Sequence, residues 1–310
     1  MTIVVAGGTG LAGSAIVRAY EATGVEVIAL NRKVVDLLDR DATTAFLKKT
    51  KPSLVVDAAA KVGGIGANNA FPVEFLSDNV RIQSNLMEAA HAADVEKFIF
   101  LGSSCIYPRD CAQPIKEEYL LTGPLEETNS AYAIAKIAGI ELIKSFRKEY
   151  GRTWISLMPT NLYGPNDNFE LQGSHVLPAF IRRFVEAAEK NVAAETLWGT
   201  GSPKREFLHV DDLAAAVVHL GSTYNSSDHI NIGTGEDLTI KALAEMVAEL
   251  AGFSGEIAWD SSKPDGTPRK VLDVSKAKSL GWAPKISLRD GIASTIAWYK
   301  DASAKGVARR

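Results

Sequence analysis

The chain has 310 residues, of which 46% are hydrophobic and 23% are charged, and its formal net charge at pH 7 is −3. Such a chain is expected to form about two globular domains and can bury a core without metal ions or disulfides. A mildly acidic chain lacks the broad basic surface of a nucleic-acid-binding protein, and no apolar run approaches the ~20 residues that span a bilayer. The sequence therefore predicts no nucleic-acid partner, no membrane partner and no bound metal. The N-terminal residues resemble a strand and not a signal peptide, and the two cysteines, Cys105 and Cys111, fit a reducing compartment, so a cytoplasmic location is expected.

Short apolar runs alternate with helical patterns through the first half of the chain. The runs expected to form strands are Ile3–Ala6, Val25–Leu30, Leu54–Ala59, Phe98–Leu101 and Ile155–Met158. The helical patterns between them cover Gly13–Ala22, Asn79–Ala93 and Ala131–Tyr150. This alternation predicts an α/β fold with a doubly wound parallel sheet of the Rossmann type.

The character of the sequence changes after about Tyr163. A loop-like cluster at residues 164–168 is followed by helical patterns at Val176–Lys190 and Ile240–Leu250 and by short strands. We expect residues 1–165 to form a dinucleotide-binding domain and residues 166–310 to form mainly a smaller α/β substrate domain. Segments near 207–234 are expected to return to the first domain.

A glycine-rich segment separates the first expected strand from the first expected helix. Its residues are Gly7, Gly8, Thr9, Gly10, Leu11, Ala12 and Gly13. Glycines permit a tight turn and let backbone N–H groups approach a pyrophosphate, whose charge the helix N-terminus stabilises. In this strand–turn–helix setting the segment predicts a dinucleotide site, although an ordinary glycine-rich turn is the alternative.

The end of the second expected strand bears on which dinucleotide binds. An acidic residue there would bind the ribose 2′-OH of NAD, but the chain reads Leu30-Asn31-Arg32-Lys33. Arg32, with Asn31, could hold a 2′-phosphate, which favours NADP(H) as the cofactor. Two alternatives stay open: Arg32 and Lys33 could be solvated loop charges, and Asp36 could fold back to the ribose.

Tyr132 and Lys136 are four residues apart in an expected helix and so lie on one face. A free tyrosine has a pKa of ~10, and a nearby ammonium lowers this pKa by favouring the phenolate. The lysine could also hold the nicotinamide ribose. Ser103, which follows the fourth expected strand, is placed to hydrogen-bond the reacting oxygen. With the glycine segment upstream, these residues predict a nicotinamide-dependent oxidoreductase; the alternative is a surface Tyr–Lys pair.

Five longer segments carry a resemblance to a known family: residues 58–65 (AAAKVGGI), 101–108 (LGSSCIYP), 132–139 (YAIAKIAG), 158–165 (MPTNLYGP) and 263–270 (KPDGTPRK). They resemble the extended short-chain dehydrogenase/reductase family and, within it, the GDP-L-fucose synthases. The similarity runs from about Val4 to Trp298. It implies NADP(H)-dependent conversion of GDP-4-keto-6-deoxy-D-mannose to GDP-L-fucose, by epimerisation at C3 and C5 followed by reduction at C4.

The resemblance also implies roles for individual residues. Tyr132 and Ser103 would hydrogen-bond the C4 carbonyl oxygen, with Lys136 beside the tyrosine. Cys105 and His175 would exchange protons on the two faces of the sugar. Considered alone, Cys105 is more simply a small buried hydrophobic residue and His175 a helix-start residue. Further implied cofactor contacts are Leu101, Gly102, Ser104, Pro159, Thr160, Asn161, Leu162, Lys136 and His175.

Four residues match substrate-binding positions of the family: Arg183, Trp198, Arg205 and Asp265. The two arginines would hold the diphosphate, the tryptophan would pack on the base or sugar, and the aspartate would accept hydrogen bonds. Taken singly, Arg183 could be a solvated helix residue, Trp198 a core residue and Arg205 part of a surface salt bridge.

Other functions remain as alternatives on the same fold. A nucleotide-sugar 4,6-dehydratase needs an acid pair after the fourth strand, where this chain has Ser104-Cys105-Ile106, and a simple 4-epimerase has no need of Cys105 and His175. A non-catalytic NADP-binding sensor is the third alternative, against which Tyr132 and Lys136 argue. The helices near residues 79–93 and 131–150 are expected to pair with their copies in a homodimer, as in relatives.

Overall fold

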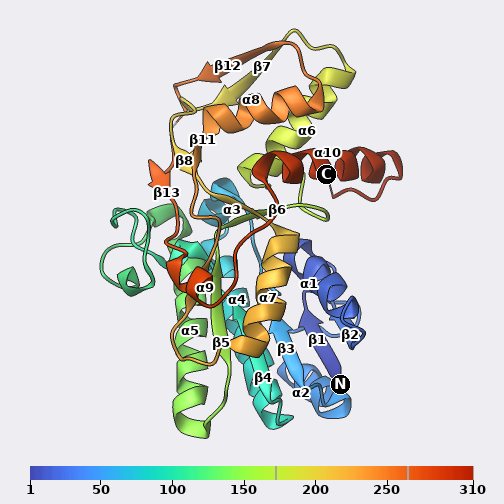
Figure 1. Cartoon of the computed structure of the whole chain (residues 1–310), viewed down its shortest axis with the longest axis vertical. Helices are drawn as coiled ribbons and strands as arrows, with labels where there is room; N and C mark the ends of the chain where they lie inside the picture. The colour runs from blue at the N-terminus through green and yellow to red at the C-terminus, as the bar shows by residue number, and fades with distance from the viewer. Residues whose placement is uncertain (172, 264, 310) are drawn as a thin grey trace.

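The computed structural model describes residues 1–171, 173–263 and 265–309. Its main feature is a six-stranded sheet with the order β10-β5-β4-β3-β1-β2, in which every neighbouring pair is parallel (Figure 1). The strands are β1 (Thr2–Ala6), β2 (Glu26–Leu30), β3 (Leu54–Asp57), β4 (Lys97–Leu101), β5 (Ile155–Pro159) and β10 (Ile230–Ile232). The predicted doubly wound sheet of the Rossmann type is therefore confirmed.

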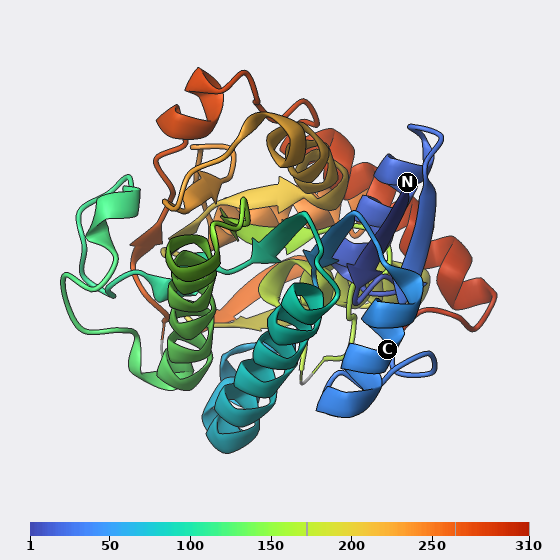
Figure 2. The same cartoon turned by 90° about the horizontal axis from the view of Figure 1, so that it is seen from below.

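Helices cover both faces of the sheet, and β1 shows why. Val4 and Ala6 belong to the hydrophobic core on one face, whereas Ile3 and Val5 belong to the core on the other, because successive side chains of a strand alternate between faces. The helices α2, α4 and α5 pack on the first face and α1 and α7 on the second. Their bounds are α1 (Leu11–Glu21), α2 (Arg40–Thr50), α4 (Pro72–Ala92), α5 (Ser130–Tyr150) and α7 (Val210–Thr223). Seen from below, the long helices α4 and α5 lie side by side (Figure 2).

Several elements begin or end one or more residues from the expected positions, and two of these differences bear on the site. The helix expected from Asn79 begins at Pro72, because proline suits the first turn of a helix, where its missing N–H group has no intrahelical acceptor. The strand expected to reach Ala59 ends at Asp57, whose carboxylate turns back to accept a hydrogen bond from the Ala59 N–H at 3.2 Å. Both differences place polar groups at the carboxyl edge of the sheet.

A smaller α/β layer lies above the carboxyl ends of the large sheet in Figure 1 and has its own hydrophobic core. It contains α6 (Val176–Glu189), α8 (Ile240–Ala251), α10 (Leu288–Ala304) and the parallel pair β7 (Ala194–Trp198) and β12 (Glu256–Asp260). Shorter elements complete the chain: α3 (Ile65–Ala70), β6 (Asn161–Tyr163), β8 (Lys204–Arg205), β9 (Phe207–His209), β11 (Leu238–Thr239), β13 (Arg269–Lys270), α9 (Ser275–Ser279), and the 3-10 turns η1 (Ser104–Ile106), η2 (Glu117–Tyr119) and η3 (Glu127–Asn129). The domain boundary expected at residue 165 stays a prediction.

Within the described residues, no helix combines the length and the apolar character needed to cross a membrane. Nor do those residues contain a group of three or more histidine, cysteine, aspartate or glutamate side chains that could hold a metal ion.

Asp167, in the loop after β6, is a buried carboxylate whose ionisation should destabilise the fold. Its Oδ1 accepts a hydrogen bond from the Asn168 N–H at 2.7 Å, and its Oδ2 has no hydrogen-bond partner among the described residues. Burial raises the pKa of Asp167 from 3.8 to about 7, although the charge of Arg309 partly opposes this. The folded state binds the Asp167 proton more tightly than the unfolded state does. The stability that this proton contributes is therefore complete below the unfolded-state pKa of Asp167 and is lost as the pH rises through 7.

We therefore expect the substitution Asp167→Asn to change the stability of the fold more favourably at pH 8 than at pH 5. The amide keeps an oxygen acceptor for Asn168 but cannot ionise. The measurement is the Tm of the variant minus the Tm of the original protein, taken at both pH values. This difference should be larger at pH 8 than at pH 5 by a few °C, since roughly 2–4 °C corresponds to 1 kcal/mol in domains of 150–250 residues. A difference in Tm that stays constant with pH would contradict this assignment.

Candidate active site

The glycine-rich segment forms the turn between β1 and α1. Gly7 adopts a φ of +72°, in the left-handed region, and a Cβ on Gly13 would lie 2.1 Å from the Gly7 carbonyl oxygen, so a larger residue at either position would displace the backbone. Gly10 caps α1 without a side-chain hydrogen bond, and the first turn of α1 holds no acidic residue. The free N–H groups of that turn can therefore bind the pyrophosphate of a dinucleotide.

The end of β2 lies beside this turn, since the Gly8 N–H donates to the Leu30 carbonyl at 3.0 Å. The Asn31 side chain accepts a hydrogen bond from the Lys33 N–H at 2.9 Å, and the exposed Arg32 takes part in no ion pair among the described residues. Asp36 accepts from the Leu38 N–H at 3.1 Å, which occupies one oxygen of the carboxylate considered for the ribose. Arg32 is thus available at this edge for a 2′-phosphate, as is the neighbouring exposed Lys33.

The remaining candidate cofactor residues lie at the carboxyl ends of β4 and β5. The N–H of Gly102 donates to the Leu157 carbonyl at 2.9 Å and that of Thr160 to the Ile232 carbonyl at 3.0 Å, so the two segments continue the sheet edge. The segments hold Leu101, Gly102, Ser103 and Ser104 after β4, and Pro159, Thr160, Asn161 and Leu162 after β5. Ligands of open α/β sheets bind outside this edge.

Tyr132 and Lys136 lie in the first turns of α5 and reach the end of β4. The Lys136 side chain is buried, its Nζ donates to the Leu101 carbonyl at 2.9 Å, and it lies 5.9 Å from the centroid of the Tyr132 ring. Burial raises the pKa of Tyr132, as does the charge of Cys105, whereas a hydrogen bond with the Ser103 side chain lowers it. Tyr132 is therefore held as a phenol, which is the proton-donating form. The lowered pKa expected from Lys136 is wrong, because burial dominates.

Cys105 lies in the η1 turn directly after β4. Its N–H donates to the Ser103 hydroxyl at 3.2 Å, and its sulfur is 3.6 Å from Lys270 Nζ and 3.7 Å from Asn129 Nδ2. Cys105 is only half-buried and is surrounded by polar donors, so it is not the small buried hydrophobic residue considered as its alternative. The ammonium of Lys270 therefore lies next to the sulfur of Cys105, at the carboxyl end of β4.

His175 is the residue that precedes α6, and its side chain makes no cap hydrogen bond. The ring keeps an exposed surface, yet the protein around it lowers the pKa of the imidazole through desolvation. The loop before it contacts the loop after β3, since the Gly64 N–H donates to the Gly173 carbonyl at 3.1 Å. Gly63 of that loop lies against the ring of Phe75, which packs edge-on to Tyr132 with a centroid distance of 6.4 Å. These contacts connect the histidine's loop with the tyrosine.

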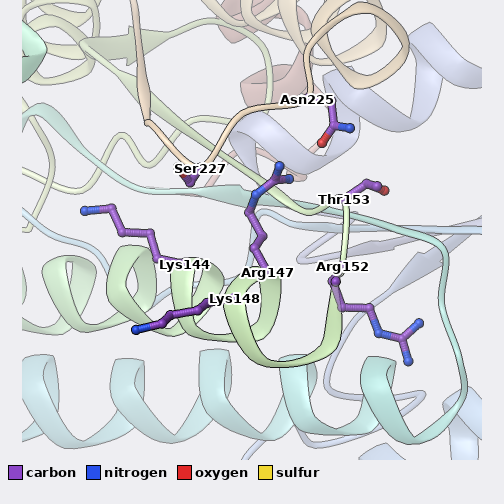
Figure 3. Close-up of a pocket in the computed structure, with 8 residues that line it drawn as sticks. Lys144, Arg147, Lys148, Arg152, Thr153, Asn225 and Ser227 are labelled. Atoms are coloured by element: carbon purple, nitrogen blue, oxygen red, sulfur yellow. The ribbon is translucent and has the colours of Figure 1, made fainter.

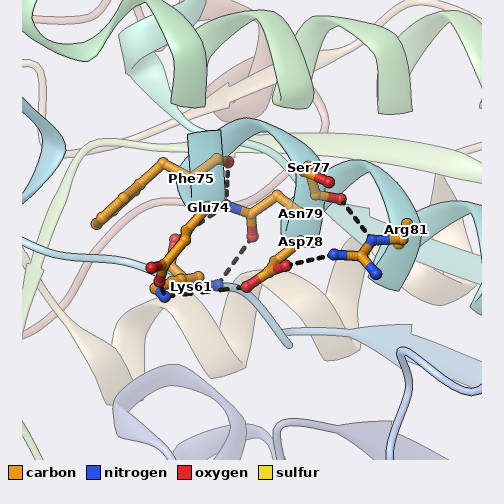
Figure 4. Close-up of polar contacts among 7 residues, drawn as sticks. All are labelled: Lys61, Glu74, Phe75, Ser77, Asp78, Asn79 and Arg81. Carbon is orange, nitrogen blue, oxygen red and sulfur yellow. Dashed lines mark hydrogen bonds and ion pairs between the residues drawn. The ribbon is translucent and has the colours of Figure 1, made fainter. Parts of the chain in front are cut away.

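A polar network at the start of α4 holds the loop after β3 in place (Figure 4). The Asn79 side chain accepts from the Lys61 N–H at 2.8 Å and donates to the carbonyls of Lys61 at 3.0 Å and Phe75 at 2.7 Å. Lys61 also pairs with Glu74 and lies 3.9 Å from Asp78. The network fixes residues that reach Tyr132 and the histidine loop, so it is part of the site's frame.

The four candidate substrate residues are held by different contacts. Arg205 is near Cys105 and Asp265, whose charges raise its pKa against the larger lowering effect of burial. Asp265 accepts from the Thr200 N–H at 3.0 Å and from its hydroxyl at 2.7 Å. Trp198, two residues before Thr200, is 74% exposed and is therefore not the core residue considered as its alternative. The Arg183 guanidinium pairs with Glu195 at 2.6 Å through Nε and Nη2, and no hydrogen bond of Nη1 is found among the described residues, so Nη1 can bind a phosphate.

Comparison with known proteins supports this arrangement. A model of the NAD dependent epimerase/dehydratase family matches residues 3–233. The chain belongs to this family. GDP-L-fucose synthase 1 of Arabidopsis thaliana is 53% identical over 298 residues, which cover 96% of this chain and 92% of the plant protein. The predicted similarity to GDP-L-fucose synthases is confirmed.

Two solved structures have nearly the same fold. A GDP-6-OMe-4-keto-L-xylo-heptose reductase from C. jejuni has a TM-score of 0.92 at 34% identity, covering 97% of each chain. A GDP-L-fucose synthetase from Naegleria fowleri, bound to NADP, has a TM-score of 0.91 at 29% identity, covering 100% of this chain and 96% of that one.

Three polar residues of this epimerase/dehydratase family member were not singled out from the sequence. Lys270 lies within a recognised motif, but its contact with Cys105 joins residues 165 positions apart. Glu206 is fully buried and accepts hydrogen bonds from the N–H groups of Thr234, Gly235 and Leu272, thereby fixing loops behind β5. Asp57 is a carboxylate at the end of the otherwise apolar strand β3. A charged residue in an apolar run is the sequence feature that could have identified it.

A basic surface cavity of about 410 Å³ lies at the far end of α5 from Tyr132, and it includes Lys144, Arg147, Lys148 and Arg152 (Figure 3). Three of the four cations already have partners within the described residues: Lys144 pairs with Glu141, Arg152 pairs with Asp94, and Arg147 donates to the Trp154 carbonyl. The cavity is separated from the candidate active site by the length of the helix.

Proposed function

We propose that this family member is a GDP-L-fucose synthase that epimerises GDP-4-keto-6-deoxy-D-mannose at C3 and C5 and reduces it at C4 with NADPH. The observation that carries the proposal is the position of Cys105 within the reduction site. Its sulfur acts electrostatically on Tyr132 and lies beside Lys270. A ketone reductase needs the tyrosine and the lysine, but it has no use for a cysteine side chain placed to exchange a proton with the substrate.

In the epimerisation, the C4 carbonyl acidifies the hydrogens on C3 and C5. The side chains of Tyr132 and Ser103 hydrogen-bond the oxygen and stabilise the enolate that forms when a proton leaves. Cys105 and His175 act on opposite faces of the ring, so that one removes the proton and the other returns one to the opposite face of the same carbon. The neutral imidazole favoured by the lowered pKa of His175 is able to accept a proton from a thiol or from solvent.

In the reduction, a nicotinamide dinucleotide held at the glycine turn between β1 and α1 would supply the hydride that C4 needs. The phenol of Tyr132 gives its proton to the C4 oxygen, which becomes a hydroxyl group. The ammonium of Lys136, on the same helix face, stabilises the tyrosinate that remains until solvent returns the proton. The raised pKa of Tyr132 keeps this proton in place before the hydride arrives. Arg205 and Asp265 are proposed to hold the GDP-sugar, with Trp198 against its base or sugar. Arg183 is proposed to offer the N–H groups of Nη1 to a phosphate oxygen while it stays paired with Glu195.

The direct test is to incubate the protein with GDP-4-keto-6-deoxy-D-mannose and NADPH and to identify the product by chromatography and NMR. GDP-L-fucose is the expected product. The structural similarity to a GDP-keto-heptose reductase makes reduction without epimerisation the second candidate. A GDP-6-deoxyhexose that keeps the substrate's configuration at C3 and C5 would establish that candidate and contradict the proposal.

NADP(H) is the proposed cofactor, on the strength of Arg32 at the end of β2 and of the NADP-bound relative. We expect Arg32→Ala to raise the KM for NADPH by about tenfold or more, because a charge-assisted hydrogen bond contributes roughly 1.5–3 kcal/mol. The KM for NADH should change little, since NADH lacks the 2′-phosphate. Steady-state kinetics with both dinucleotides provide the measurement, and Lys33→Ala serves as the matched control. Equal changes in the two KM values would show that Arg32 does not bind the 2′-phosphate.

A homodimer formed through α4 and α5 is also proposed. Exposed apolar side chains on these helices include Val73, Ile134 and Tyr150, and a second copy would cover them. Sedimentation at micromolar concentration should show a dimer, and a monomer alone would exclude it. The cytoplasmic location stays a prediction.

A further inference from the structure

Asp57 places a carboxylate in the apolar core beneath the candidate active site. It is the last residue of β3, after Leu54, Val55 and Val56, and its exposed fraction is 0%. Its Oδ1 accepts one hydrogen bond, from the Ala59 N–H, and its Oδ2 has no partner among the described residues. Buried carboxylates are rarely tolerated without a counter-charge, so a nearby cation is expected.

The register of the sheet identifies that cation. Asp57 lies beside Phe100 of β4, and paired residues of neighbouring strands present their side chains on the same face. Lys136 Nζ lies 4.8 Å from the centroid of the Phe100 ring on this face. Gly139 brings α5 close to the strand, since a Cβ there would lie 2.3 Å from Phe100 Cζ. Asp57 and Lys136 therefore share one buried space.

Asp57 and Lys136 act on each other as charges, and no hydrogen bond joins them among the described residues. The ammonium of Lys136 has three N–H groups, of which one donates to the Leu101 carbonyl in the described part of the chain. The other titratable groups that act here are Tyr132 on α5 and Cys105 in η1. Burial raises the pKa of Asp57 to about 6 and lowers that of Lys136, and each charge opposes the effect of burial on the other. Asp57 is consequently ionised at neutral pH.

We propose that Asp57 is a positioning residue that keeps Lys136 as an ammonium, adds to the burial that holds Tyr132 as a phenol, and so sets the upper pH limit of the reduction. A negative charge next to both groups favours their protonated forms. The charge of Asp57 therefore raises the pKa of both the tyrosine and the lysine. This inference rests on the proposed function, because it concerns the reduction step.

The first test compares the pH dependence of kcat for NADPH oxidation in the original enzyme and in Asp57→Asn. The alkaline limb should move to lower pH by about one unit or more in the variant, as expected for loss of a charge at short range. The two profiles should converge below about pH 5, where Asp57 is protonated. Asp167→Asn, which removes a buried carboxylate elsewhere, should leave the limb in place. An unmoved limb in Asp57→Asn, or an equal shift in Asp167→Asn, would overturn the proposal.

The second test does not depend on turnover. The 13Cγ resonance of Asp57, assigned by its loss in Asp57→Asn or in Asp57→Glu, is followed by NMR as the pH is varied. In Lys136→Met the midpoint of this titration should rise by about one unit or more, because the opposing charge is gone. An unchanged midpoint would refute the pairing even in an active enzyme. A shifted midpoint in a protein that does not reduce the keto-sugar would contradict the proposed function and leave the pairing standing.

Discussion

Tyr132→Phe should lower kcat for NADPH oxidation with the keto-sugar by roughly 10²–10⁴-fold, the range found for a lost general acid. The reason is specific to this site, where burial holds the phenol protonated and the Ser103 side chain orients it. Phenylalanine keeps the ring that packs against Phe75 and removes only the donor. The KM for NADPH should stay within about threefold, because the nucleotide contacts lie at the glycine turn and the ends of the strands.

The control for this variant lies on the same helix. Tyr150→Phe changes an exposed tyrosine at the other end of α5 and should leave kcat unaltered. Exchange of the C3 and C5 hydrogens should fall less than reduction in Tyr132→Phe, since the Ser103 hydroxyl still stabilises the enolate. A variant that retains more than about a tenth of the original kcat would remove Tyr132 from the role of general acid.

Cys105→Ser should slow solvent exchange at C3 and C5 by roughly 10²–10⁴-fold while largely sparing hydride transfer. Serine preserves the size of the side chain and its position beside Asn129 and Lys270, but its hydroxyl is a far weaker acid than a thiol. Hydride transfer can be measured separately, because oxidation of GDP-L-fucose by NADP⁺ runs the reduction in reverse and needs no epimerisation. Its initial rate should fall by less than about tenfold.

The matched control is Cys111→Ser, which alters the other free cysteine of the chain. Cys111 packs against the core on the α4 and α5 side, and burial raises its thiol pKa, so it is unsuited to accept a proton. Its replacement should spare both activities. Equal losses of exchange and of reverse oxidation in Cys105→Ser would show that the thiol is not specific to the epimerisation.

The local features of the molecule could be predicted from the sequence because their determinants are close together in the chain. The glycine turn depends on neighbouring residues, and the Tyr132–Lys136 pair depends on the repeat of one helix. The same holds for the alternating strands and helices of the large sheet. The start of α4 could not be predicted because its first two turns, Pro72 to Asp78, carry little apolar periodicity.

Features that depend on distant segments could not be predicted in this way. The contact of Lys270 with Cys105 and the position of Asp57 beside Lys136 follow from strand order and helix packing, which no local pattern encodes. The pKa of Tyr132 was expected to fall because its helical neighbour was considered without the burial that dominates in the folded protein. Arg183 could be matched to a family position, yet its pairing with Glu195 of β7 appears only in three dimensions.

The central claim is that one site exchanges the hydrogens at C3 and C5 and then reduces C4. The most direct measurement is the NMR spectrum of the product formed from GDP-4-keto-6-deoxy-D-mannose and NADPH in D₂O. We expect GDP-L-fucose that carries solvent deuterium at both C3 and C5, and hydrogen at C4 from the NADPH hydride. A reduced product that keeps hydrogen at C3 and C5 would contradict the claim, because it would show that the ketone is reduced without epimerisation.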